Sequence, residues 1–318
     1  MTHPRHFMSV VMSTHNQPWE IDKTLYSLFR QTGMNDNEFE VIVLNTQMED
    51  KETIRIMKKY KAEHENLRFI QVYDEKRNLI TNATYGLNLG VRQFANGELL
   101  LLVVDPARVP TPGSIRKTRD EFERWGDDIV TTTIPYHFLK HYSDPNFTVE
   151  ECREAFLKTR WKKNMDCLWD YAAHTNISSS GVPNESTWLG VTRKNFMKVG
   201  GHNEIFHTWS DYNLDLWRRL TRPLPKLGKQ LVGDYNERWG KIGLGLDVRI
   251  LQGEADFHLH HSLSDAARDF SMLKQLRIDS WNEYEDNQDC IVANLTRPDW
   301  GTGEAYEVSF QGDLMELD

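Results

Sequence analysis

One aspartate, Asp105, stands at the end of an apolar run of six residues, 99–104, and Pro106 follows it. An unbroken apolar run of this length is typical of a strand in a parallel sheet that helices cover on both faces. Sheets of this kind bind ligands at the carboxyl ends of their strands. We therefore expect Asp105 to lie where a ligand binds, while its position alone leaves the chemistry open.

Strands and helices alternate over residues 1–135. Apolar, β-branched runs predict strands at 7–14, 39–45, 67–73 and 99–104. Apolar residues at helical spacing predict helices at 21–32, 49–64 and 82–95. This alternation predicts an α/β fold with a doubly wound, mainly parallel sheet that helices flank.

The pattern is less regular from residue 136 onward. Aromatic-rich helices are expected over 136–174, and the Ser, Gly and Pro content of 175–187 predicts a loop. The elements predicted after the loop are a strand at 187–192, a helix at 210–221 and a strand at 247–253. The residues from 262 to 318 form an acidic C-terminal extension.

Composition limits the class of protein. The chain has 318 residues, of which 39% are hydrophobic and 27% charged, and no run approaches the roughly 18 apolar residues of a membrane helix. The first residues are more typical of a strand than of a secretory signal, so we expect a cytoplasmic protein without an integral membrane segment. The three cysteines are too few and too dispersed for a disulfide framework or a zinc cluster. A net charge of −9 disfavours broad attraction to nucleic acid or anionic membranes.

Three stretches, in this order, resemble the nucleotide-sugar glycosyltransferases of the GT-A fold, most closely family two. The first, 9–32 with 39–50, is similar to that family's opening strand, helix and second strand. The second, 82–115, is similar to its asparagine-bearing helix and the strand that delivers an acidic metal-binding motif. The third, 188–220, is similar to its GG-x-x-E turn, tryptophan loop and acidic helix.

The resemblance implies a GT-A domain over 1–261, with a nucleotide-binding half at 1–135, an acceptor-side half at 136–261 and an extension at 262–318. It implies transfer of a sugar from a nucleoside diphosphate, often UDP, to an acceptor, usually with inversion and a divalent metal. The acceptor is unknown, and a glycan, a protein or a nucleic acid are all open.

Candidate nucleotide-sugar contacts lie at the ends of the first two predicted strands and on the helix before the acidic motif. Asn45 matches the position where the family usually has an aspartate that reads the base, and an amide can both donate and accept hydrogen bonds. The alternative for Thr14 and Asn16 is turn formation and helix capping. The full set is Ser13, Thr14, Asn16, Asn45, Asn88 and Asp105.

The metal-binding motif of the family, aspartate, any residue, aspartate, here corresponds to Asp105, Pro106 and Ala107, so one carboxylate is missing. By the same resemblance, His258 or His261 would complete the site, with His261 slightly preferred. Imidazole suits Mn²⁺ better than Mg²⁺, so Mn²⁺ is the preferred cofactor, with Mg²⁺ as the alternative. Arg108 is expected to be a solvated loop residue rather than a phosphate ligand.

The general base of the family lies in a glutamate-aspartate pair, which here corresponds to Tyr212 and Asn213. Asp211 is therefore the candidate base, and its alternative role is to cap the helix that it begins. Trp209 and Asn213 are candidate contacts to the acceptor or sugar. Asp215 is expected to pair with Arg218 or Arg219 along the helix, and Glu204 to anchor its own loop.

The two incomplete motifs also allow a second function, in which a catalytically weakened GT-A fold binds a sugar nucleotide or a glycan without turnover. A nucleotidyltransferase is disfavoured, because the glycine-rich and basic phosphate loop of such enzymes is absent from 12–20.

Overall fold

The structure is a computed structural model that describes residues 7–15, 17–46, 50–73, 83–138, 168–169, 188–204, 211–221, 244–258 and 299–310. Its centre is one sheet with the strand order β10-β3-β2-β1-β4-β8-β6-β9-β5, and β7 pairs with β6. The strands are β1 (Met8–Thr14), β2 (Phe39–Asn45), β3 (Leu67–Tyr73), β4 (Leu99–Val103), β5 (Arg108–Pro110), β6 (Ile129–Phe138), β7 (Leu168–Trp169), β8 (Trp188–Thr192), β9 (Asp247–His258) and β10 (Glu304–Glu307).

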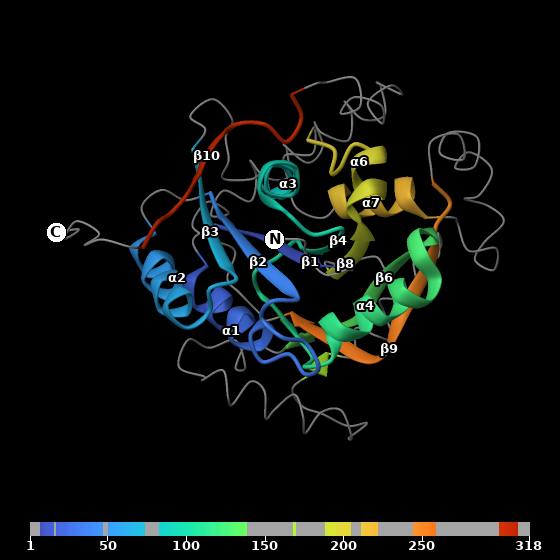
Figure 1. Ribbon diagram of the computed structural model, residues 1–318, viewed down its shortest axis with the longest axis horizontal. Coiled ribbons are helices and arrows are strands. Elements are labelled where there is room, and N and C mark those ends of the chain that lie inside the picture. The colour runs from blue at the N-terminus through green and yellow to red at the C-terminus, as the bar shows by residue number, and fades with distance from the viewer. Residues whose placement is uncertain are drawn as a thin grey trace.

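Helices lie on both faces of this sheet (Figure 1). They are α1 (Pro18–Leu28), α2 (Lys51–Glu63), α3 (Ala83–Leu89), α4 (Ser114–Trp125), α6 (Arg193–Lys198) and α7 (Asp211–Leu220). A π-helical turn, η2 (Gly90–Phe94), continues α3, and a 3₁₀ turn, η3 (Gly126–Asp128), follows α4. The expected α/β architecture, a central sheet flanked by helices, is thus the observed one.

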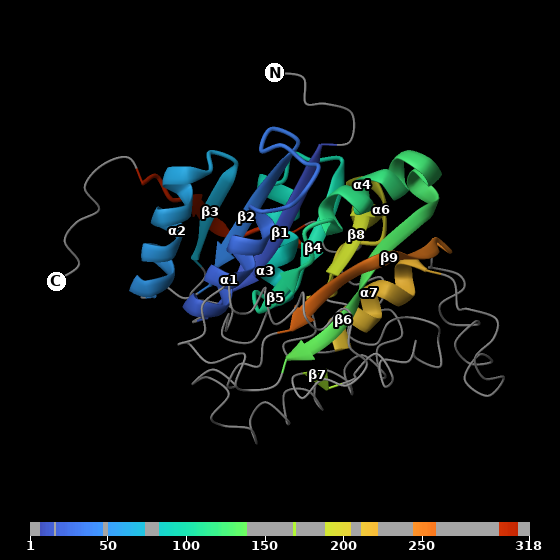
Figure 2. The same ribbon diagram turned by 90° about the horizontal axis from the view of Figure 1, so that it is seen from below.

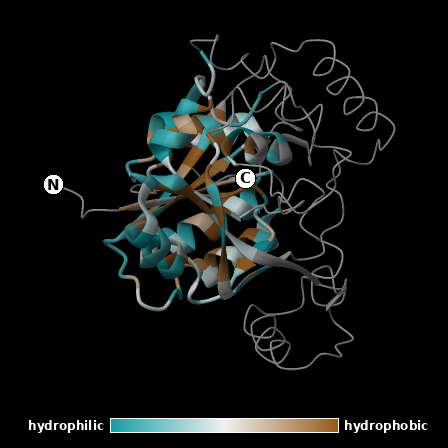
Figure 3. Ribbon diagram, turned by 90° about the vertical axis from the view of Figure 1, so that its right-hand side faces the viewer, coloured by the Kyte–Doolittle hydropathy of each residue, from teal (hydrophilic) through white to brown (hydrophobic). Residues whose placement is uncertain are grey.

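The parallel half of the sheet explains the apolar runs. β1 pairs in parallel with β2 and with β4, and every residue of these three strands is buried. Successive side chains point to opposite faces, so Val10 and Met12 pack with α1 and α2, whereas Val11 packs with the cluster that contains α3 and α7 residues. Figure 3 shows the hydrophobic residues concentrated in these central strands.

A close approach of η2 to the sheet requires a glycine. A Cβ at Gly90 would lie 2.6 Å from Leu44 Cδ1 and 2.8 Å from Val11 Cγ1. Because Gly90 has no side chain, the helix that contains Asn88 lies directly on β1 and β2.

The second half of the sheet is mixed. β8 runs antiparallel to β4 and to β6, and β5 runs antiparallel to β9. The strand predicted at 247–253 extends to His258 and pairs in parallel with β6, which was not predicted as a separate strand. Figure 2 shows β5 and the carboxyl end of β9 side by side at the lower edge of the sheet.

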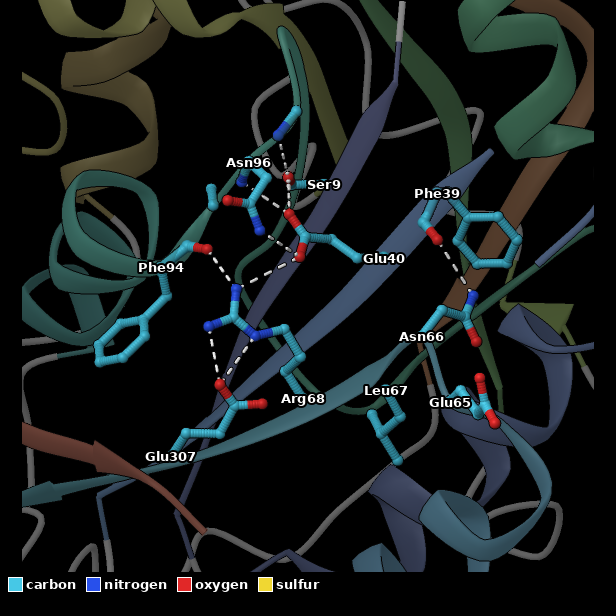
Figure 4. Close-up of polar contacts among 12 residues, drawn as sticks. Ser9, Phe39, Glu40, Glu65, Asn66, Leu67, Arg68, Phe94, Asn96 and Glu307 are labelled. Atoms are coloured by element: carbon cyan, nitrogen blue, oxygen red, sulfur yellow. Dashed lines mark hydrogen bonds and ion pairs between the residues drawn. The ribbon is translucent and has the colours of Figure 1, made fainter. Parts of the chain in front are cut away.

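The C-terminal extension contributes to the same sheet, because β10 pairs antiparallel to β3. Arg68 links the two strands: its guanidinium lies 2.8 Å from Glu307 and 3.4 Å from the buried Glu40 (Figure 4). Glu40 also accepts hydrogen bonds from Ser9 Oγ, at 2.6 Å, and from the backbone N–H of Asn96, at 2.7 Å. These contacts join β10 to the amino ends of β1, β2 and β3.

Among the described residues, no helix has both the length and the apolar character that crossing a membrane requires. The cytoplasmic location stays a prediction.

Candidate functional site

The carboxyl ends of β1 and β2 form a polar edge. The parallel register places Ser13 beside Leu44 and Thr14 beside Asn45, so three of the predicted contact residues lie together. The Oγ1 of Thr14 is buried and has no hydrogen bond to any described residue. A buried hydroxyl without a partner is costly, and a bound ligand at this edge would satisfy it.

Asn45 is fully buried, and its side-chain amide points towards β3. Its Nδ2 donates to Gln71 Oε1 at 3.0 Å, and Gln71 Nε2 donates to the backbone carbonyl of Asn45 at 3.1 Å. Gln71, at the end of the third strand, was not among the residues selected from the sequence. Its contact with Asn45 arises because β2 and β3 are parallel neighbours.

His15 lies directly after β1 and was also missed, because a lone histidine in a turn carries no sequence signal. Its Nδ1 is 3.0 Å from Thr46 Oγ1, and that hydroxyl donates to the Thr14 carbonyl at 3.2 Å. A hydroxyl has one hydrogen, so when Thr46 Oγ1 donates to the Thr14 carbonyl, Nδ1 of the neutral ring carries the proton and Nε2 the lone pair. Burial lowers the pKa of His15, although the nearby Asp50 carboxylate acts in the opposite direction. The imidazole is therefore a neutral acceptor at pH 7.

Asp105 follows β4, the other parallel neighbour of β1. The last pair between β1 and β4 is Met12 with Val103, so Asp105 follows two residues after β4 at the same end of the sheet as Thr14. The carboxylate is partly exposed, and its Oδ1 accepts a hydrogen bond from the backbone N–H of Ala107 at 2.9 Å. Thr24 of α1 donates to the Pro106 carbonyl at 2.6 Å, which holds this turn against α1.

The expectation that Arg108 is a solvated loop residue was wrong. Its side chain is 2% exposed and forms an ion pair with Asp256 at 3.0 Å, while Thr133 Oγ1 donates to the same carboxylate at 2.6 Å. The three residues come from β5, β9 and β6, and β5 begins at Arg108 directly after the Asp105 turn. Arg108 therefore fixes strands beneath the site and does not face solvent.

The described residues do not by themselves make a metal site. No group of three or more His, Cys, Asp or Glu side chains among them is arranged to hold an ion. Ala107 places a buried methyl where the second carboxylate of the motif would be. The backbone of His258 pairs with Arg108, three residues after Asp105, but its side chain and the whole of His261 lie outside what the structure describes.

Asn88 is fully buried and bonds within the protein. Its Nδ2 donates to the His202 carbonyl at 2.7 Å and to Glu204 Oε1 at 3.0 Å, and its Oδ1 accepts from the His202 backbone N–H at 2.8 Å. Both amide hydrogens and the carbonyl oxygen are thus used. This structure gives Asn88 a positioning role between α3 and the 199–204 turn, and its contact with a nucleotide stays a prediction.

Helix α7 begins at Asp211, as expected. Asp215 pairs with Arg219 at 2.5 Å, and Arg219 also donates to the Val199 carbonyl at 2.5 Å, which confirms the predicted pairing along the helix. Asn213 is buried, with 7% of its surface exposed. The side chain of Asp211 and the residues Asn16 and Trp209 lie outside the described part of the chain.

A pocket of about 510 Å³ lies elsewhere, between Leu99 at the start of β4 and Thr192 at the end of β8. Two of its charged side chains are used within the protein: Lys194 pairs with Asp127 at 3.0 Å, and Arg193 donates to the Ala95 carbonyl at 2.8 Å. The pocket lies at the amino end of β4, whereas Asp105 follows the carboxyl end of the same strand.

A mixed sheet with a polar edge at the carboxyl ends of its strands is the architecture that the resemblance to GT-A enzymes implies. The model of the family described as Glycosyl transferase family 2 matches residues 9–180, and the chain belongs to this family. It is therefore a glycosyltransferase, and the resemblance noted in its sequence is confirmed. No curated protein sequence matches the chain.

Several solved structures share the fold. TarS 1-349 from S. aureus is 16% identical, with a TM-score of 0.50 over 90% of this chain and 69% of that chain. The same protein in complex with UDP-GlcNAc is 15% identical, with a TM-score of 0.51 over 93% and 73%. The mannosyltransferase PcManGT from Pyrobaculum calidifontis, in complex with GDP-Man and Mn²⁺, is 10% identical, with a TM-score of 0.50 over 94% and 72%.

Proposed function

We propose that the protein transfers a sugar from a nucleoside-diphosphate sugar, by preference a UDP-sugar, to an acceptor with inversion at the anomeric carbon. The observation that carries the proposal is the shared edge formed where β1 ends at Thr14 and where Asp105 follows β4, because β1 and β4 are parallel neighbours. UDP-GlcNAc and GDP-Man in the similar structures support a nucleotide sugar as the donor class.

The nucleotide would lie over the ends of β1 and β2. Thr14 offers its buried hydroxyl, and the neutral His15 offers Nε2 as an acceptor for a hydroxyl or N–H of the ligand. Ser13, Asn16 and Asn45 complete the proposed contacts. Asp105 lies beside them at the end of β4, where the diphosphate would be placed.

The proposed metal is a divalent ion, Mn²⁺ before Mg²⁺, with Asp105 and either His258 or His261 as protein ligands. Such an ion, when bound, would offset the charge that develops on the departing diphosphate. The described residues supply Asp105 alone, so the metal assignment depends on His258 or His261.

Asp211 is the proposed general base. A negative charge at the first residue of α7 is favoured by the helix dipole. In the proposed step, the acceptor hydroxyl oxygen forms a bond to the anomeric carbon, the bond from that carbon to the diphosphate oxygen breaks, and the hydroxyl proton passes to Asp211. Trp209 and Asn213 are the proposed contacts to the sugar or acceptor.

A donor screen tests this function. UDP- and GDP-sugars are incubated with the protein, with Mn²⁺, with Mg²⁺ or with EDTA, and the release of nucleoside diphosphate is measured. We expect release from at least one UDP-sugar, greater with Mn²⁺, and a fall of about 10²-fold or more for Asp211→Asn. Asp127→Asn, at the opposite edge, is the matched control and should keep the activity of the unmodified protein. Absence of release across the panel, with acceptors present, would contradict the proposal.

The replacement of a carboxylate by Ala107 favours a second candidate function, a GT-A fold that binds a sugar nucleotide or glycan without turnover. Thermal unfolding separates the two. A binding module is stabilised by UDP or a glycan and releases no product, whereas an active transferase shows both effects.

A further inference from the structure

The C-terminal residues 299–303 close over α3 and the 199–204 turn. Trp300 is buried in the same apolar cluster as residues of the central strands, with its ring 6.4 Å from that of Phe196. The guanidinium of Arg92 lies 5.1 Å from the Trp300 ring and also donates to the Trp300 carbonyl. The side chain of Tyr85 donates to the Thr302 carbonyl at 2.8 Å.

Glu204 connects this segment to the turn that precedes α7. Its Oε1 accepts hydrogen bonds from the backbone N–H of Gly301, at 2.7 Å, and from Asn88 Nδ2, at 3.0 Å. A buried carboxylate with one donor removed loses stabilisation that the solvent cannot replace. The position of Glu204 therefore depends on residue 301, which is 97 positions further along the chain.

The contact between residues 299–303 and the 199–204 turn is close enough to require a glycine in each segment. A Cβ at Gly201 would lie 2.7 Å from Trp300 Cζ3 and 2.5 Å from Asn88 Oδ1. A Cβ at Gly301 would lie 2.9 Å from the backbone carbonyl oxygen of Asn88. Both glycines also have positive φ, +65° and +61°, which other residues rarely adopt.

The same turn is held from a third side by α7 itself. Arg219, paired with Asp215, donates to the Val199 carbonyl at 2.5 Å. The 199–204 turn thus lies between α3, the C-terminal segment and the helix that begins with Asp211. A displacement of the 199–204 turn would reach α7 through this hydrogen bond between Val199 and Arg219.

We propose that 299–303 is a positioning element of the transferase, in which the Gly301 N–H sets the place of Glu204 and, through the 199–204 turn, the place of α7. The inference rests on the proposed function, because α7 carries the candidate base. Residues 299–303 would then contribute to catalysis by positioning α7.

The test compares Gly301→Ala with Gly126→Ala in the full chain. Gly126 has a similar φ, +67°, but nothing lies within 4 Å of a Cβ there, so this variant controls for backbone strain. For Gly301→Ala we expect faster amide hydrogen exchange in 199–204 and 211–221, unchanged exchange in β1 and β2, and a kcat for UDP release from a UDP-sugar lower by about 10-fold to 10²-fold. The Kd for UDP should stay within about twofold. Gly126→Ala should change none of these.

Equal exchange in 199–221 for the two variants, or an unchanged kcat in Gly301→Ala, would overturn the inference. If Gly301→Ala fails to fold, Glu204 provides the second comparison. Glu204→Gln keeps an oxygen that can accept from Gly301 and should resemble the unmodified protein, whereas Glu204→Ala should show the faster exchange. A Glu204→Ala protein with unchanged exchange in 299–303 and 211–221 would also overturn it.

Failure of the proposed function and failure of the positioning role of residue 301 give different results. Absence of UDP release by the unmodified protein contradicts the proposed function and, with it, the catalytic part of this inference. The exchange comparison needs no turnover, and it decides separately whether residue 301 positions α7.

Discussion

Arg108 and Asp256 form an ion pair of 3.0 Å between β5 and β9, with 2% and 0% of their side chains exposed. Removal of one partner leaves a buried charge without compensation. Asp256→Ala should therefore lower the free energy of unfolding by about 3–5 kcal/mol, as measured by urea denaturation. Asp127→Ala removes the exposed partner of Lys194 and should cost no more than about 1 kcal/mol. Equal losses in the two variants would contradict the role given to this pair.

Asp105→Asn separates chemistry from folding. The amide oxygen can still accept the hydrogen bond from the Ala107 N–H, so the free energy of unfolding should change by less than about 1 kcal/mol. The charge is lost, and release of nucleoside diphosphate should fall by about 10²-fold or more. Steady-state kinetics and urea unfolding of the same preparation check both statements. A variant with full turnover would remove Asp105 from the proposed site.

Ala107→Asp restores the missing carboxylate of the family motif. The methyl of Ala107 is fully buried beside Asp105, so a second carboxylate there is both desolvated and repelled. We expect a loss of about 3 kcal/mol or more in the free energy of unfolding without metal. Mn²⁺ should raise the melting temperature of this variant more than that of the unmodified protein, as measured by thermal unfolding. The same Mn²⁺ response in both proteins would contradict a metal site at this turn.

His15 should give the protein a pH-dependent stability. Burial lowers its pKa below the ordinary value of 6.5, so the unfolded chain binds the proton more readily than the folded protein. The stabilisation is complete above pH 6.5 and is lost as the pH falls below that value towards the folded pKa, by about 1.4 kcal/mol for each unit of pKa difference. Urea unfolding between pH 8 and pH 5 should show a steeper loss for the unmodified protein than for His15→Gln. Parallel pH profiles would contradict the assignment.

The sequence alone was sufficient for the elements whose signal is local. The strands at 39–45 and 67–73 were predicted at their observed bounds, because buried parallel strands have continuous apolar runs. The position of Asp105 at a strand end followed from the same pattern, and parallel pairing then placed Thr14 beside Asn45. Periodicity also predicted the helix over 82–95, which is α3 together with η2. β6 was missed, because its threonines at 131–133 interrupt the apolar pattern although they are buried.

The partners of side chains that lie far apart in the sequence were decided only by the tertiary structure. Arg108 and Asp256 are 148 residues apart, and Glu204 and Gly301 are 97 apart. No local pattern predicts such distant partners, because they depend on how the chain crosses the sheet, whereas the pair of Asp215 with Arg219, four residues apart, was predicted from helical spacing. The tautomer of His15 likewise depends on Thr46, which directly follows β2 and whose hydroxyl donates to the Thr14 carbonyl. The sequence therefore determined where the polar edge lies, and the packing of distant segments determined what each residue at that edge can do.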